Sequence, residues 1–325
     1  QAAEAKLKLT EAEAKAKKDK PKNSKYVFFD FETNTRHSST KYQKGQHQPY
    51  LCCAKGAGEN DVRTYYGRHC GQHLLKDICS EYGDAYDEIV LIAHNCGYDY
   101  RFLKKYLYRQ ELIESGHFLI CGSGYYYHGS NITKIVFKDS FRVIPKKLAD
   151  FGECFDLEQE KEIMFYDLYN TENIEKGFIK LEDCLAYAKK NKDKEKFIEN
   201  CKKWDLINKK GEVSILEYSA RYCALDVEVL EAGYCKFRDD IMKISTGLKL
   251  GEPPIDLYEK FTISSVAIDY LKKDGCFEGT YELAGVVREF IQKCVVGGRV
   301  MLKDNKKQYV RRRFCKKRNK ICYIE

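Results

Sequence analysis

The hydrophobic and polar positions of this chain alternate between short apolar runs and longer stretches with helical spacing. Short apolar runs bounded by Gly, Asn or Asp predict buried strands, at residues 26–32, 49–56, 61–67, 88–95, 124–129 and 134–140. Apolar residues spaced three and four apart predict helices, at residues 69–83, 97–112, 174–190, 194–204 and 217–241. Strands interleaved with helices predict an α/β domain with a mixed central sheet and flanking helices.

Two stretches depart from this interleaved pattern. Residues 1–24 are rich in Ala, Lys and Glu, with acidic and basic side chains four apart. That spacing is typical of an exposed charged helix or a linker, and we expect no chemistry there. Residues 167–217 are highly charged and have helical spacing.

Length and composition limit the class of protein. The 325 residues are enough for one large domain or two ordinary ones, and 33% charged with 43% hydrophobic residues is typical of a soluble, globular chain. No apolar run approaches about 18 residues, so we predict no membrane span. We find no signal peptide, and because the chain begins with Gln rather than Met, we expect it to be a piece of a longer protein.

The cysteines indicate a reducing, intracellular environment. There are 15 of them, an odd number, and none lies in a CxxC pair. The neighbours Cys52 and Cys53 cannot easily bridge each other, so we predict free thiols rather than a disulfide scaffold. The cluster from His69 to His73 has metal-ligand residue types but lacks a second ligand pair, so it does not predict a zinc site.

The net charge of +8 is concentrated near the C-terminal end of the sequence. Residues 303–320 contain ten Lys or Arg against one Asp, and the rest of the chain is nearly neutral. Such a basic block often binds a phosphate backbone. The alternative is a solvated hairpin with no ligand.

A pair of acids raises the first chemical question. Asp30 and Glu32 end the apolar run "YVFFDFE", and because they are two apart on a predicted strand, they project from the same face. Two carboxylates on one face repel each other unless a cation lies between them. A hard divalent ion such as Mg²⁺ binds through a few carboxylates, water and substrate phosphate. Such acid pairs are also common on exposed strands, so further ligands are needed.

Two later stretches offer those ligands. In "NCGYD", Asn95 can cap the helix that follows a strand, and Asp99 falls in its first turn, where negative charge is favoured. In "YCALD", Tyr222 and Asp226 are four apart and share a helix face. Each stretch taken alone is also compatible with an ordinary helix.

The combination and order of these stretches resemble the proofreading exonucleases of the DEDD class, in the tyrosine-bearing branch that includes family B DNA polymerases. The resemblance implies a ribonuclease H-like fold and 3′→5′ hydrolysis of single-stranded DNA ends. Asp30, Glu32, Asp99 and Asp226 then hold two metal ions, Mg²⁺ or Mn²⁺, which stabilise the attacking and leaving oxygens at phosphorus. Tyr222 is implied to orient the attacking water.

Residues 138–152, "KDSFRVIPKKLADFG", resemble a segment of the protein-primed family B polymerases of viruses, linear plasmids and virus-like transposons. By this resemblance, Ser140 and Phe141 of this chain would contact the single-stranded 3′ end. Lys161 would neutralise charge on the scissile phosphate. The residues implied to grip the frayed primer end are Thr33, Asn95 and Tyr98. Tyr98 could stack on a base of any kind.

The stretch "VVGGRVML" resembles the family's joint between exonuclease and polymerase parts, although Val295 stands where a tyrosine is usual. Gly297 and Gly298 fit close backbone approach to DNA. The implied DNA contacts of the basic block are Arg311, Arg312 and Arg313. The sequence ends at "KICYIE", just short of the expected first metal-binding motif of a polymerase palm.

The resemblance thus implies an exonuclease domain at 25–240, with a helical insertion at about 167–217, and a β-rich connector at 241–325 that leads to a missing palm. The implied partners are single-stranded and primer–template DNA, a terminal protein that primes synthesis, and the rest of the polymerase chain, with no membrane partner. The implied location is the host cytoplasm or nucleus, or a virion. A standalone DEDD nuclease acting on DNA or RNA and a non-enzymatic single-stranded DNA-binding domain remain the alternatives.

Overall fold

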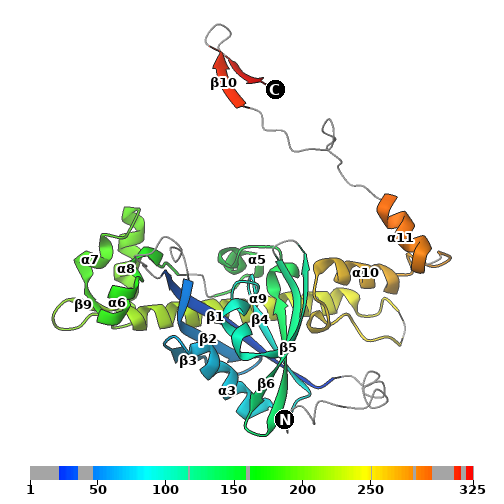
Figure 1. Ribbon diagram of the computed structural model, residues 1–325, viewed down its shortest axis with the longest axis horizontal. Coiled ribbons are helices and arrows are strands. Elements are labelled where there is room, and N and C mark those ends of the chain that lie inside the picture. The colour runs from blue at the N-terminus through cyan, green and yellow to red at the C-terminus, as the bar shows by residue number, and fades with distance from the viewer. Residues whose placement is uncertain are drawn as a thin grey trace. The chain divides into compact units, whose positions relative to one another are not determined.

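A computed structural model describes residues 22–35, 47–115, 118–158, 162–249, 251–280, 283–294, 311–315 and 320–324 (Figure 1). The chain divides into two compact units, Gln1–Cys276 and Phe277–Glu325.

The first unit is built on a seven-stranded mixed sheet. In spatial order its strands are β3 (Arg63–Tyr66), β2 (His47–Gly56), β1 (Ser24–Thr35), β4 (Glu88–Ala93), β7 (Asn131–Asp139), β6 (Phe118–His128) and β5 (Tyr108–Ser115). The three central strands β1, β4 and β7 run parallel, and the outer pairings on both sides are antiparallel. The predicted strands are therefore present in one sheet.

Alternate residues of β1 pack into two separate cores. Val27, Phe29 and Phe31 join the core under α3 (Cys70–Tyr82), which covers one face of the sheet. Phe28 joins the core on the opposite face, where the 31-residue helix α9 (Ile215–Ser245) crosses β1 and β2 (Figure 1). Because the side-chain period of a strand is two, Asp30 and Glu32 follow Phe28 onto the α9 face. A mixed sheet with helices on both faces confirms the predicted α/β class with a mixed central sheet and flanking helices.

Short elements connect the central strands. After β4 come α4 (Tyr100–Leu103) and the 3₁₀ turn η1 (Lys104–Tyr106), and after β7 come η2 (Ser140–Arg142), η3 (Leu148–Asp150), α5 (Phe151–Phe155) and η4 (Tyr166–Leu168). The helix expected over 97–112 is confirmed only over Tyr100–Tyr106, because the chain leaves the helical conformation at Leu107 and enters edge strand β5 at Tyr108. The pairing of β5 with β6 outweighs the helical spacing of this segment.

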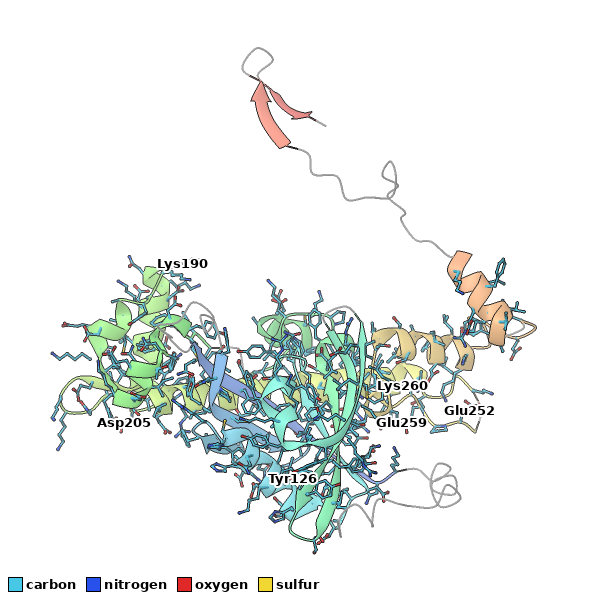
Figure 2. The ribbon with its side chains drawn as sticks, in the orientation of Figure 1. Tyr126, Lys190, Asp205, Glu252, Glu259 and Lys260 are labelled. Atoms are coloured by element: carbon cyan, nitrogen blue, oxygen red, sulfur yellow. The ribbon has the colours of Figure 1, made fainter. Side chains whose placement is uncertain are left out.

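The predicted insertion forms a small lobe at one end of α9. It contains α6 (Thr171–Lys176), β8 (Phe178–Lys180), α7 (Leu181–Leu185), α8 (Asn191–Lys203) and β9 (Glu212–Ser214), and Figure 2 marks it with Lys190 and Asp205. The single helix expected over 174–190 is wrong, since Gly177 adopts φ +71° and ends α6. The backbone then forms β8, which pairs with β9.

The remaining elements follow α9. The first unit ends with η5 (Leu257–Glu259), whose Glu259 is labelled in Figure 2 with the adjacent Lys260, and with α10 (Ile263–Lys273). The second unit contains α11 (Gly285–Cys294) and an antiparallel hairpin of β10 (Arg311–Cys315) and β11 (Lys320–Ile324). Every cysteine whose side chain the structure describes is a free thiol. Among the described helices, none has the length and apolarity needed to cross a bilayer.

Candidate functional site

Carboxylates gather where β1 meets α9. Asp30 and Glu32 from β1 and Cys223 from α9 each place one potential ligand atom within 4.8 Å of the other two. The thiol of Cys223 donates to the carbonyl oxygen of Asp30 at 3.5 Å and to its Oδ2 at 3.8 Å. Glu32 and Cys223 are buried, and Asp30 is half-buried. This group therefore lies at the edge of the core.

Asp99 approaches the same place from the end of β4. It precedes the first residue of α4 and is only 2% exposed. Burial raises the pKa of its carboxyl group well above the ordinary value, and the negative charge of Asp30 raises it further. Its Oδ1 is buried without a hydrogen-bond partner among the described residues. Asp99 is thus a buried acid beside a second acid.

Tyr222 and Asp226 reach the site from one face of α9. Both are buried, at 2% and 3% exposure. Burial raises the pKa of the Tyr222 phenol, and the charges of Asp226 and Glu32 raise it further. The Tyr222 hydroxyl lies 3.1 Å from the hydroxyl of Tyr166 on η4. Asp30 and Glu32 thus lie in one close group, Asp99 interacts electrostatically with Asp30, and Tyr222 interacts with both Asp226 and Glu32.

A pocket of about 650 Å³ opens beside these acids. Its lining consists of Phe31, Glu32, Thr33, His47, Tyr98, Tyr166, Asp167, Tyr169 and Asn170. The Tyr98 hydroxyl is 2.7 Å from the Thr33 Oγ1 and 2.7 Å from the His47 Nδ1. Aromatic rings and two acids thus line one pocket beside the carboxylate group.

The turn after β4 differs from the expected helix cap. Asn95 is exposed with φ 65° and does not cap α4, because Asp99 occupies the cap position and makes no side-chain capping bond. The backbone N–H of Asn95 instead donates to the Asp139 Oδ1 at 2.8 Å, and that of Phe141 donates to the same oxygen at 3.0 Å. Asp139 therefore ties the turn after β4 to the turn after β7.

Ser140 also connects these two turns, through hydrogen bonds inside the protein. It is fully buried, its Oγ donates to the Ala93 carbonyl at 3.1 Å, and it lies 2.9 Å from the His94 Nδ1. Its hydroxyl is therefore occupied by protein partners and closed to DNA. Phe141 is half-buried, and its ring packs edge to face on that of His94.

Several predicted residues lie where no contact can be described. Lys161, Gly297 and Gly298 fall outside the described residues. Arg311, Arg312 and Arg313 are described only as the backbone of β10. Their implied roles stay predictions.

Several residues of the site were missed in the sequence: Cys223, His47, Tyr166, and the pocket residues Asp167, Tyr169 and Asn170. Cys223 directly follows Tyr222, and its residue type, compatible with metal binding, was the available signal. His47 carries no local signal, because its place beside Thr33 and Tyr98 follows from the pairing of β2 with β1.

The family described as DNA polymerase type B, organellar and viral, matches residues 85–314. A search of curated protein sequences gives no match. Among solved structures, phi29 DNA polymerase complexed with single-stranded DNA is similar, with 13% identity, a TM-score of 0.49, and coverage of 90% of this chain and 42% of that chain. Its ternary complex with primer–template DNA and incoming nucleotide substrates gives 12% identity, a TM-score of 0.48 and the same coverage of 90% and 42%. The chain thus spans less than half the length of these polymerase chains.

Proposed function

Because this chain belongs to the organellar and viral family of type B DNA polymerases, we propose that it is the 3′→5′ exonuclease region of a protein-primed member. The observation that carries the proposal is the gathering of Asp30, Glu32, Asp99, Asp226 and Tyr222 where β1 meets α9. We propose that the exonuclease domain spans 25–240 and the connector 241–325.

The residues of the site fit a bound divalent metal. Burying like charges beside each other is costly unless an opposite charge is added. Asp99 has a buried Oδ1 without a hydrogen-bond partner in the described part of the chain, which leaves that oxygen available as a ligand. Asp30, Glu32, Asp99 and Asp226 would hold two ions, Mg²⁺ or Mn²⁺, because carboxylate oxygens suit both. When bound, such ions stabilise the charge that develops on the attacking and leaving oxygens at phosphorus.

The side chains around these acids would position the reactants. The phenol of Tyr222, which stays protonated because burial and nearby acids raise its pKa, is suited to orient the attacking water. Tyr98, supported by Thr33 and His47, would stack on or hydrogen-bond to the terminal nucleotide. Phe141, at the turn after β7, would contact the next base.

The remaining partners are proposed from family membership. Lys161 would neutralise the scissile phosphate, and Asn95 would contact the primer end from its exposed turn. Gly297, Gly298 and Arg311, Arg312 and Arg313 would contact DNA on its path to the polymerase part. A terminal protein would supply the priming hydroxyl for the parent polymerase.

The test is degradation of a 5′-labelled single-stranded oligonucleotide by the full 325-residue chain. In the presence of Mg²⁺ we expect a ladder shortened from the 3′ end, and no products when Asp30→Ala and Glu32→Ala are combined. The matched control combines Glu111→Ala and Glu114→Ala on β5, two acids that are exposed and distant in the sheet order. Equal degradation by both double variants would refute the exonuclease assignment. Faster degradation of an RNA oligonucleotide than of DNA would point to an RNA nuclease.

A further inference from the structure

We propose that Cys223 makes the carboxylate cluster a binding site for a thiophilic divalent cation such as Zn²⁺ or Cd²⁺. Its ligands would be the Cys223 Sγ and one carboxylate oxygen from each of Asp30 and Glu32. Such an ion would compete with Mg²⁺ and inhibit cleavage, and this consequence rests on the proposed exonuclease function. Binding of the ion to these three side chains does not depend on that function.

The spacing of the three side chains fits one such ion. Zinc binds sulfur at about 2.3 Å and carboxylate oxygen at about 2.0–2.2 Å, so two ligand atoms of one tetrahedral ion lie about 3.4–3.7 Å apart. The candidate atoms of Asp30, Glu32 and Cys223 all lie within 4.8 Å of one another before any ion draws them in. A small rotation of each side chain is therefore enough.

The kinds of ligand atom favour a soft ion over a hard one. Magnesium takes oxygen ligands, whereas zinc and cadmium gain from a thiolate. Three protein ligands with a fourth position left for water form a common open zinc site. On binding, the Cys223 thiol releases its proton to solvent as the sulfur–metal bond forms, and no oxidation or reduction is involved.

A second observation points to a cation at this place. Asp99 is only 2% exposed, the charge of Asp30 acts on it, and its Oδ1 has no hydrogen-bond partner among the described residues. A buried oxygen in this state is a ready ligand or a charge partner for an ion held by Asp30. The site is therefore more than a thiol beside two acids.

Cadmium binding gives a direct test, because a cadmium–thiolate bond has its own ultraviolet charge-transfer absorption. The full chain, Cys223→Ser and Cys201→Ser are each titrated with Cd²⁺ after reduction of all thiols. Cys201 is the matched control, since it is equally buried but packs in the core with Cys184 and lies in α8. We expect one high-affinity equivalent of absorption to be lost in Cys223→Ser and kept in Cys201→Ser. Equal titrations for the two variants would overturn the proposal.

Asp30→Asn keeps Cys223 and tests whether the carboxylate takes part. Removal of a residue that only orients a metal ligand weakens metal affinity by roughly 10- to 100-fold, so loss of a direct carboxylate ligand should lower the Cd²⁺ affinity by at least tenfold. An unchanged affinity would show a thiol that binds alone and would overturn the three-ligand site. Circular dichroism on each variant identifies any that fails to fold, in which case Cys223→Ala replaces Cys223→Ser.

Zinc inhibition then tests the consequence for catalysis. Nuclease rates at fixed Mg²⁺ are measured with rising Zn²⁺, each variant being normalised to its own rate without zinc. We expect Cys223→Ser to need about tenfold more Zn²⁺ than Cys201→Ser for half inhibition. Equal zinc sensitivity would overturn the competition. A Cys223-dependent cadmium signal in a chain without nuclease activity would support the binding site and refute the exonuclease function instead.

Discussion

Two stretches of the same helix, α9, treat charge in opposite ways. Around Tyr222 and Asp226, the helix meets the acids of β1, where burial and then the charges of Asp226 and Glu32 raise the pKa of the Tyr222 phenol. Two to three turns later, Glu231 contacts the Lys55 Nζ at 2.7 Å. Further along, Arg238 makes two bonds to the Asp256 carboxylate, at 2.6 and 2.7 Å.

The acids around Asp226 indicate a ligand-binding site, whereas the ion pairs of Glu231 and Arg238 stabilise the packing of the helix. Opposite charges in contact hold α9 to β2 and to the segment after the helix, and they are satisfied within the protein. Like charges gathered in a buried place cost free energy, which the fold tolerates if a ligand supplies the opposite charge. The first stretch therefore points to function and the second to stability.

The largest expected effect comes from replacing one acid in each stretch by its amide. Asp226→Asn should lower the rate of 3′-end cleavage by about 10³-fold, a loss comparable to removing one strong electrostatic contribution in an enzyme. Its free energy of unfolding without metal should stay equal or rise, since one repelling charge is gone. The measurement is single-turnover cleavage together with urea unfolding.

Glu231→Gln is the matched variant on the same helix. It should keep most of the cleavage rate but lose about 1–3 kcal/mol of unfolding free energy, because the Lys55 partner is left without its charge. If the two variants gave the same loss of stability and the same loss of rate, the distinction between the two stretches would fail.

The next effect concerns two tyrosines one turn apart. Tyr222→Phe should lower the cleavage rate by roughly 10²-fold, as expected when a group that orients the reacting water loses its hydroxyl. Tyr218→Phe removes a hydroxyl that donates to the Ile163 carbonyl at 2.7 Å, so it should cost about 1 kcal/mol of stability with little change in rate. A larger loss of rate in Tyr218→Phe than in Tyr222→Phe would contradict the assignment of the site.

The smallest expected effect is the pH dependence of the stability that the Arg238–Asp256 ion pair contributes. Burial acts to raise the pKa of Asp256, but the hydrogen bonds from Arg238 and the Tyr258 backbone amide outweigh it, so the pKa lies below the ordinary value. An acid with a lowered folded-state pKa adds stability above its unfolded-state pKa of about 3.9, and this stability is lost as the pH falls through the folded-state pKa.

Asp256→Asn should therefore be less stable than the unchanged chain by about 1 kcal/mol at pH 7, a value reduced by partial exposure. The difference should shrink as the pH falls below about 4. Urea unfolding at a series of pH values measures it. A difference that grows toward low pH would show that the carboxylate is not stabilised by Arg238.

The sequence was most informative where local pattern and tertiary structure agree. The period of two placed Asp30 and Glu32 on one face of β1, and helical spacing placed Tyr222 and Asp226 on one face of α9. Both were predictable because a buried strand and a long amphipathic helix leave strong local patterns.

The features that could not be predicted from the sequence depend on contacts between residues far apart in the chain. Residues 97–112 have helical spacing, yet Tyr108 starts an edge strand because β6 is available as a partner. His47 reaches Tyr98 only through the register of β2 against β1. Ser140 is buried because the turn after β7 packs against the end of β4, where its hydroxyl contacts Ala93 and His94.

The central claim is that the acids between β1 and α9 hold catalytic metal ions. The most direct measurement is an anomalous difference map from crystals of the chain soaked in Mn²⁺, which marks manganese independently of the protein. We predict manganese peaks bonded to carboxylate oxygens of Asp30 and Glu32, with Asp99 and Asp226 completing the two ion sites. Manganese bound only elsewhere on the chain, with none at Asp30, would contradict the account.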